Sequence, residues 1–209
     1  MAADAFIDLE AFRKAALVEK PFAYAMVPGF VKSDAIAAIE ADFPKVELPG
    51  SFPLPTLKFG PAFEGFMAAI TGPQLRWAVE QKFGMDLSAR PTMVTVRGQS
   101  RASDGKIHID SRTKLVTVLI YMNGKWEPQG GRLRLLRSQD DLNDVIAEVP
   151  PDEGTLLIFK NELNAWHGFE GFAGPRKVIQ LNWVTSDRVV WWEQTRHKIS
   201  AFFKSLRGR

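Results

Sequence analysis

Three residues of this sequence have the types and the spacing needed to bind one metal ion. Only three histidines occur in the chain, and two of them, His108 and His167, lie in segments rich in apolar residues. Asp110 follows His108 by two positions, so in a β-strand both side chains point to the same face and can reach one cation. Two imidazoles and one carboxylate leave coordination positions open, the arrangement that suits non-haem iron(II) oxygenases. The pattern predicts a metal site of His108, Asp110 and His167.

Arg176 is the fourth candidate, nine residues after His167 and directly after Gly174-Pro175. From the start of a strand beside the metal, its guanidinium can bind a carboxylate in a two-pronged geometry. Taken singly, an arginine is usually a surface cation and a strand histidine is usually structural. The combination of all four residues, in this order, favours a site that holds a metal and an organic acid.

Composition excludes several other kinds of site. Of the 209 residues, 45% are hydrophobic and 24% are charged, which is typical of a soluble globular protein with one core. The absence of cysteine excludes disulfides, thiolate zinc sites, iron–sulfur clusters and cysteine nucleophiles. No phosphate-binding loop, dinucleotide fingerprint or G-x-S-x-G motif is present. The N-terminus lacks signal-peptide features and no apolar stretch is long enough to span a bilayer, so we expect a cytoplasmic protein.

Residues 1–90 read as mostly helical. Ser33 is a candidate N-cap for a helix that ends at Pro44, and two more amphipathic helices follow, the second closed by Gly84. Between the first helix and the next, Pro44–Pro61 forms a long apolar loop, either a lid over a substrate or a segment packed on the core.

From Arg90 the hydrophobic period changes to two, punctuated by turn residues. About eight short strands in succession favour a sandwich or barrel, so we expect one domain: helical support in 1–90, a β core in 91–187 and a helix in 188–209. The expected strands are Met93–Arg97, Ile107–Asp110, Leu115–Tyr121, Arg132–Leu136, Val145–Val149, Thr155–Phe159, Ala165–Phe169 and Val178–Val184.

These motifs resemble, in order and spacing, the 2-oxoglutarate- and iron-dependent dioxygenases, and among them the prolyl-hydroxylase group. The resemblance covers about ninety residues, and its fold would be a double-stranded β-helix, a jelly-roll or cupin-like core with flanking helices. The matching segments are His108-Ile109-Asp110, Leu119-Ile120-Tyr121-Met122-Asn123, Trp126, Gly130-Gly131-Arg132-Leu133-Arg134, Thr155-Leu156-Leu157-Ile158-Phe159, His167 and Gly174-Pro175-Arg176.

The resemblance implies roles for these residues and a reaction. His108, Asp110 and His167 would bind Fe(II), and Arg176 would pair with the distal carboxylate of 2-oxoglutarate, with Tyr121 bonded to the same carboxylate. The family uses O2, is supported by ascorbate, and couples decarboxylation of 2-oxoglutarate to succinate and CO2 with hydroxylation of an unactivated carbon. Related halogenases lack the metal-binding carboxylate, so its presence favours hydroxylation.

Other residues are open to two interpretations. Tyr121 fits core packing as well as cosubstrate binding, and Gln180 stands where relatives often have a small hydroxyl residue. Arg97 replaces a tyrosine that relatives place near the substrate, which argues against a prolyl substrate. Arg97 and Arg132 are candidates to contact a substrate, although strand cations are more often solvated.

Two further functions remain as alternatives. A non-catalytic cupin-like module would bind a metal or a small acid without consuming oxygen. A metal-independent interaction domain would act through the basic, aromatic tail 188–209, which accounts for the high isoelectric point. Asp140, Asp141, Asn143 and Asp144 lack the spacing of a calcium loop. We expect a small-molecule or peptide substrate and no nucleic acid.

Overall fold

Two antiparallel β-sheets form the body of the protein. The structure is a computed structural model and describes residues 5–190. Its larger sheet has the strand order β1-β7-β4-β9-β3-β2, and its smaller sheet the order β6-β5-β8. The strands are β1 Tyr24–Val27, β2 Phe52–Pro53, β3 Thr92–Ser100, β4 Lys114–Tyr121, β5 Leu133–Leu136, β6 Val145–Val149, β7 Leu156–Lys160, β8 Trp166–Gly168 and β9 Gly174–Val184.

The larger sheet has two faces of different character, because side chains alternate along each strand. On β4, Val116, Val118 and Ile120 belong to the core beneath the helices. The intervening Thr117, Leu119 and Tyr121 face the smaller sheet and line a cavity. The β3 and β9 strands alternate in the same way, so the space between the sheets is walled by alternate residues of three neighbouring strands.

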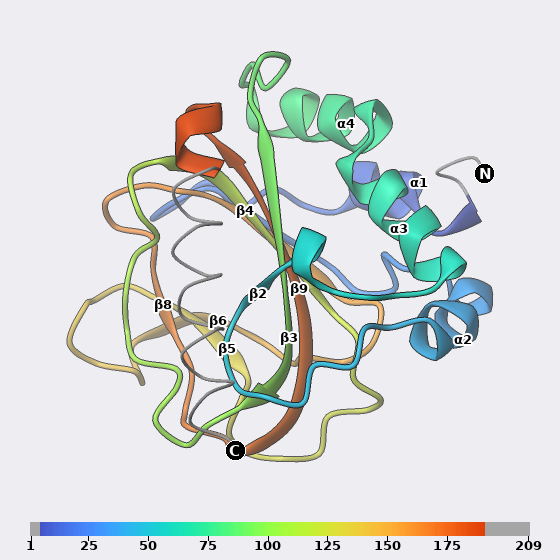
Figure 1. Ribbon diagram of the computed structural model, residues 1–209. Coiled ribbons are helices and arrows are strands. Elements are labelled where there is room, and N and C mark those ends of the chain that lie inside the picture. The colour runs from blue at the N-terminus through green and yellow to red at the C-terminus, as the bar shows by residue number, and fades with distance from the viewer. Residues whose placement is uncertain (1–4, 191–209) are drawn as a thin grey trace.

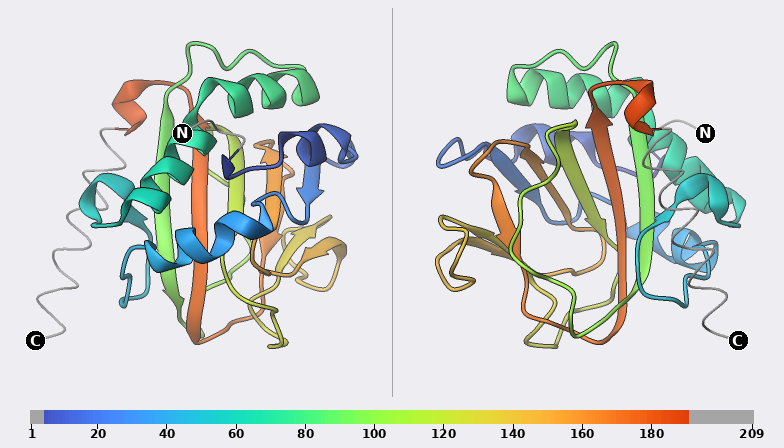
Figure 2. Two further views of the ribbon diagram at one scale, coloured as in Figure 1. Left: turned by 90° about the vertical axis from the view of Figure 1, so that its right-hand side faces the viewer. Right: turned by 60° about the vertical axis from the view of Figure 1, so that its left-hand side comes forward.

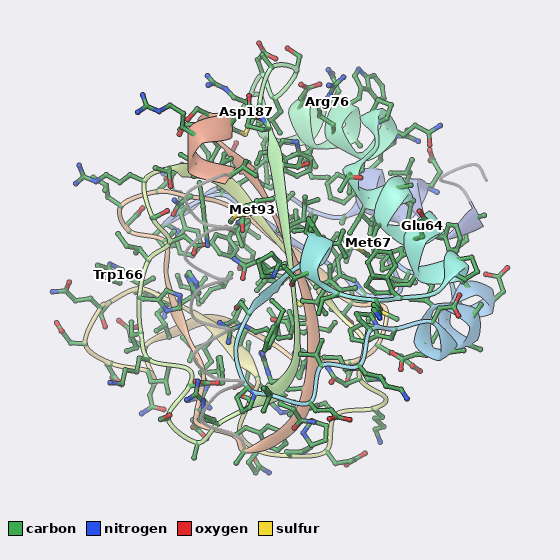
Figure 3. The ribbon with its side chains drawn as sticks, viewed as in Figure 1. Glu64, Met67, Arg76, Met93, Trp166 and Asp187 are labelled. Carbon is green, nitrogen blue, oxygen red and sulfur yellow. The ribbon has the colours of Figure 1, made fainter. Side chains whose placement is uncertain are left out.

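Four α-helices cover the other face of the larger sheet (Figures 1 and 2). Phe63, Phe66 and Ile70 form the buried stripe of α3, and Leu75 and Val79 that of α4. Figure 3 labels Met67 on α3, which packs in this core, and Met93 on β3, which lines the cavity. The helices are α1 Leu9–Lys14, α2 Ser33–Ala41, α3 Pro61–Thr71 and α4 Pro73–Phe83, and η2 Leu54–Thr56 is a short 3₁₀ turn.

This arrangement is the jelly-roll core expected from the sequence, and it corrects some local expectations. Ile107–Asp110 is not a regular strand: it makes one isolated bridge, between His108 and His167. The region expected to be helical also contributes β1 and β2, which pair with strands far along the chain.

Helix ends follow the sequence in part. Gly84 ends α4 in the left-handed conformation (φ 60°), as predicted, because glycine has no Cβ to oppose it. Ser33, by contrast, is not the N-cap of α2: that position is Lys32, and Ser33 is the first helical residue.

The apolar loop 44–61 packs mainly on the core. Phe52, Leu54, Leu57 and Phe59 are all partly buried against it. Only Ser51 from this loop reaches the cavity. Residues 187–190 are helical, and the rest of the tail predicted as a helix lies outside the described residues. No helix in residues 5–190 is both long enough and apolar enough to cross a bilayer.

Candidate active site

His108, Asp110 and His167 meet at one end of the space between the sheets. Each offers one ligand atom, and these atoms all lie within 4.8 Å of one another. His167 comes from β8 and His108 from the segment bridged to it, so the two imidazole centroids are 4.3 Å apart. His167 is 5% exposed and Asp110 is 9% exposed, whereas His108 is exposed at the rim.

Both imidazoles are oriented in the same way. Nδ1 of His108 lies 2.8 Å from the carbonyl oxygen of Lys106, and Nδ1 of His167 lies 2.9 Å from that of Ala165. Because a carbonyl oxygen only accepts, Nδ1 must carry the proton in each case, which leaves the Nε2 lone pair available in the neutral ring. Such outer hydrogen bonds fix the ring orientation of metal-binding histidines.

The electrostatics favour the metal-binding forms of these groups. Burial, assisted by the neighbouring His108, lowers the pKa of His167 from 6.5 to about 4, so its ring is neutral at physiological pH. For Asp110, burial acts to raise the pKa, but the nearby Lys114 and His167 and the hydrogen bonds from Lys114 and Thr117 together lower it. A neutral imidazole and an ionised carboxylate are the forms that ligate a cation.

A chain of hydrogen bonds holds Asp110 from behind. Thr117 donates to Asp110 Oδ2 at 2.5 Å, and Asn182 Nδ2 donates to the Thr117 hydroxyl at 2.8 Å. Gln180 Nε2 donates to the Asn182 side-chain oxygen at 3.2 Å. On the other oxygen, Lys114 Nζ lies 2.6 Å from Asp110 Oδ1. Each carboxylate oxygen retains a second lone pair for a cation.

Arg176 lies farther into the same space and is 5% exposed. Its Nε donates to the Gly131 carbonyl oxygen at 2.8 Å, and its guanidinium carbon lies 4.4 Å from the Phe169 ring centroid and 5.5 Å from that of Tyr121. The hydroxyl of Tyr121 is buried and has no hydrogen-bond partner among the described residues. Burial raises the pKa of Tyr121, against the influence of Arg176, so this hydroxyl stays protonated.

A cavity of about 540 Å³ joins the metal-binding end to Arg176. Of the other sequence candidates, Tyr121, Gln180 and Arg97 line it. Arg132 does not: its guanidinium donates to the carbonyl oxygens of Trp126 and Pro128 and so braces a surface loop.

Sequence reasoning missed several residues of this site, among them Thr117, Asn182, Lys114 and Ser51, which all line the cavity. A signal existed for two of them, because Thr117 and Asn182 are polar residues flanked on both sides by apolar ones within a strand. Buried polar side chains of this kind have a hydrogen-bond partner in the great majority of cases.

The sequence model described as "2OG-Fe(II) oxygenase superfamily" matches residues 97–185, the segment that carries all four candidate residues. These residues are similar to that superfamily, and they make up less than half of the chain. A search of curated proteins finds no match to this chain.

Several solved structures share the fold of this chain. A prolyl-4-hydroxylase from Pseudomonas putida has a TM-score of 0.55 and 18% identity, covering 88% of this chain and 92% of that one. HygX from Streptomyces hygroscopicus, with nickel and 2-oxoglutarate bound, has a TM-score of 0.53 and 14% identity, covering 78% and 82%. A Trichoplax adhaerens prolyl hydroxylase in complex with a hypoxia inducible factor peptide fragment has a TM-score of 0.50 and 17% identity, covering 77% and 83%.

The match to the oxygenase model, in a chain with this fold and a His-Asp-His cluster, identifies the protein as a 2-oxoglutarate-dependent dioxygenase that uses Fe(II). Its cavity fits both groups. Two imidazoles, each oriented by a hydrogen bond at Nδ1, and a carboxylate form a donor set suited to Fe(II). The unpartnered Tyr121 hydroxyl, beside the buried Arg176 guanidinium, matches a carboxylate that accepts from both.

Proposed function

We propose that this oxygenase hydroxylates an unactivated carbon of its substrate, with His108, Asp110 and His167 as the iron ligands. The observation that carries this proposal is the convergence of the three ligand atoms to within 4.8 Å, at the end of a cavity whose other end holds Arg176. When bound, iron and 2-oxoglutarate supply the oxidising power, and the chain supplies position and surroundings.

Each residue has a defined task in this proposal. The imidazoles donate Nε2 to the metal, while the main-chain carbonyls at Nδ1 keep the rings in place. Arg176 and Tyr121 would donate to the distal carboxylate of 2-oxoglutarate and so hold the cosubstrate in the cavity. The walls formed by Phe169, Leu133 and Val178 exclude water from the cosubstrate.

Asp110 is the residue that favours hydroxylation over halogenation. Its carboxylate occupies one coordination position, and Thr117 and Lys114 keep it ionised and in place. A halide that needs the same position therefore has no access to it.

The first experiment measures cosubstrate binding separately from turnover. Calorimetry under argon, with Mn(II) in place of Fe(II), should detect 2-oxoglutarate binding in the wild type and a loss of at least about tenfold in Arg176→Gln, since charge-assisted pairs contribute that much. Asp110→Ala should abolish Mn(II) retention. Asp104→Asn is the matched control, because Asp104 also lines the cavity but lies outside the ligand group.

The second experiment measures the reaction. Purified protein with Fe(II), ascorbate and 2-oxoglutarate should release succinate slowly, and faster with a true substrate, and His108→Ala should stop both. A variant without His108 that still forms succinate, or a wild type that binds 2-oxoglutarate without consuming O2 in the presence of any metabolite or peptide mixture, would refute the proposal.

A further inference from the structure

The charges lining the cavity are unbalanced. Six charged side chains line it, and the cations outnumber the carboxylates by four to two: Arg97, Lys106, Lys114 and Arg176 against Asp104 and Asp110. In the proposed function, a divalent metal and a dianionic cosubstrate add equal and opposite charges. The excess of positive charge in the cavity therefore remains after the metal and the cosubstrate have bound, and it acts on the substrate that enters.

Of the four cations, Arg97 is the half-buried one whose charge has no partner in the site. Lys106 is exposed to solvent, Lys114 is paired with Asp110, and Arg176 lies over the Tyr121 ring and donates to the Gly131 carbonyl oxygen. Arg97 donates one hydrogen bond, from Nε to Ser51 Oγ at 2.8 Å. It takes part in no ion pair among residues 5–190, and its two Nη groups donate to no other described residue.

The position of Arg97 in the sheet directs it into the cavity beside the cosubstrate. Tyr121 on β4 pairs with Val178 on β9, and Val178 pairs with Arg97 on β3, so the three residues form one row across the sheet. All three line the cavity. Arg97 thus stands two strands away from Tyr121, on the side where β2 and Ser51 close the wall.

An isolated cation at this place is unfavourable without a partner. Burial lowers the pKa of Arg97, and Asp104 and Asp110 act against this effect. The charge of Arg97 in turn opposes that of Arg176. Asp104 is also engaged by Arg101, through the main-chain amide and a 4.0 Å ion pair. The two guanidinium groups line one cavity, for which the proposed function supplies one anionic ligand.

We propose that Arg97 binds a carboxylate of the primary substrate, so that this oxygenase acts on an organic acid. The inference rests on the proposed function and adds the substrate class. With Nε held by Ser51, the guanidinium presents its two Nη groups as a free edge, which matches the two oxygens of one carboxylate. The substrate acid thereby lies beside the cosubstrate, with its remaining carbons turned toward the metal.

Acetate is the probe, because it is small enough to enter any open part of a cavity of this size, and acetamide is its neutral counterpart. Zn(II) and 2-oxoglutarate are loaded first, and broadening of the probe methyl resonance is measured by NMR. We expect saturable acetate binding and none by acetamide. Arg97→Gln should weaken acetate binding at least about tenfold, and Arg97→Lys less, because it keeps the charge but loses the two-pronged edge.

Lys106→Gln is the matched control: Lys106 lines the same cavity but is exposed, so acetate binding should change little. Thermal unfolding checks that each variant is folded. If Arg97→Gln does not fold, the acetate affinity of Arg97→Lys tests the inference instead. Equal acetate binding in wild type and Arg97→Gln, acetamide binding as strong as that of acetate, or no acetate binding in the wild type would each overturn the inference. Inorganic phosphate binding at least tenfold tighter than acetate would overturn the carboxylate assignment.

Calorimetry of 2-oxoglutarate separates this inference from the proposed function. We expect the affinity for 2-oxoglutarate to be retained in Arg97→Gln. If it is lost only in that variant, Arg97 is a cosubstrate residue and the inference fails while the proposed function stands. If 2-oxoglutarate binds to no form of the protein, the proposed function fails as well.

Discussion

Thr117 on β4 donates a 2.5 Å hydrogen bond to Oδ2 of Asp110, and both residues are buried. Thr117 in turn accepts from Asn182 on β9, the strand next to β4. A candidate metal ligand on a loop is thereby fixed to the central strands of the larger sheet. Asp110 can hold its place without a metal because this pair connects it to two neighbouring strands in the middle of the larger sheet.

Replacing Thr117 with valine should weaken metal binding without unfolding the protein. Valine has the shape of threonine but cannot donate, so Asp110 loses one of the two hydrogen bonds that orient it. Removal of such outer-shell partners costs roughly 10- to 100-fold in metal affinity. Competition with a metal chelator measures the effect. Thr113→Val is the control, since among residues 5–190 the Thr113 hydroxyl bonds only to that of Ser111, at the surface. Equal losses in both variants would contradict the role of Thr117.

Tyr121→Phe should separate cosubstrate binding from stability. The Tyr121 hydroxyl is buried and unpartnered in the ligand-free protein, so its removal should leave the melting temperature unchanged or raise it. The same change removes a donor to 2-oxoglutarate, and its affinity should fall roughly 10- to 150-fold, as expected for loss of a hydrogen bond to a charged group. Melting curves with and without 2-oxoglutarate measure both effects. A lower melting temperature without ligand, with unchanged 2-oxoglutarate affinity, would assign Tyr121 to packing alone.

Gly105→Ala should disturb the Arg176 end of the cavity through Phe169. Gly105 has φ +97°, and a Cβ there would lie 2.2 Å from the Phe169 carbonyl oxygen and 2.7 Å from its ring. The Phe169 ring also packs against the Arg176 guanidinium. We expect a destabilisation of about 2–4 kcal/mol, measured by urea unfolding, together with weaker 2-oxoglutarate binding. Gly124→Ala is the control, because no atom lies within 4 Å of its Cβ position, and it should be close to neutral.

The metal-free protein should lose stability as the pH falls from about 6.5 to 4. His167 has a pKa of about 4 in the folded state, below the 6.5 of an imidazole in the unfolded chain, so in this window the unfolded chain binds a proton that the folded protein does not. Stability therefore rises with pH through the window, by up to about 3 kcal/mol for a shift of this size. Urea unfolding at several pH values measures the slope.

The matched variant for this pH effect is His167→Asn, which removes the titrating ring. Its stability should depend less on pH between 4.5 and 6.5 than that of the wild type. Asp110, whose pKa is lowered, contributes to the loss only at still lower pH and leaves this comparison intact. Identical slopes in the two proteins would show that His167 is not buried as a neutral ring.

The sequence alone determined the candidate ligands and most of the strands. The alternation of side chains along a strand brings together His108 and Asp110, and the order of the family motifs adds His167 and Arg176. The strands β3, β4 and β9 alternate with a period of two because one face packs under the helices and the other lines a cavity, and this alternation is visible in the sequence. Gly84 ended its helix as expected, since that depends on one residue and its own backbone.

Only the tertiary structure decided what pairs with what. The short strands β1 and β2 have no clear strand pattern in their own sequence. They form because they pair with β7 and β3, which lie far along the chain. Ile107–Asp110 alternates as a strand does, yet it has only one bridge to pair with. From the sequence, Arg97 and Arg132 were equally good candidates for a substrate contact. The register of β3 places the Arg97 side chain in the cavity, whereas the Arg132 guanidinium binds main-chain carbonyl oxygens outside the cavity. Such outcomes depend on contacts between distant segments, which no local pattern encodes.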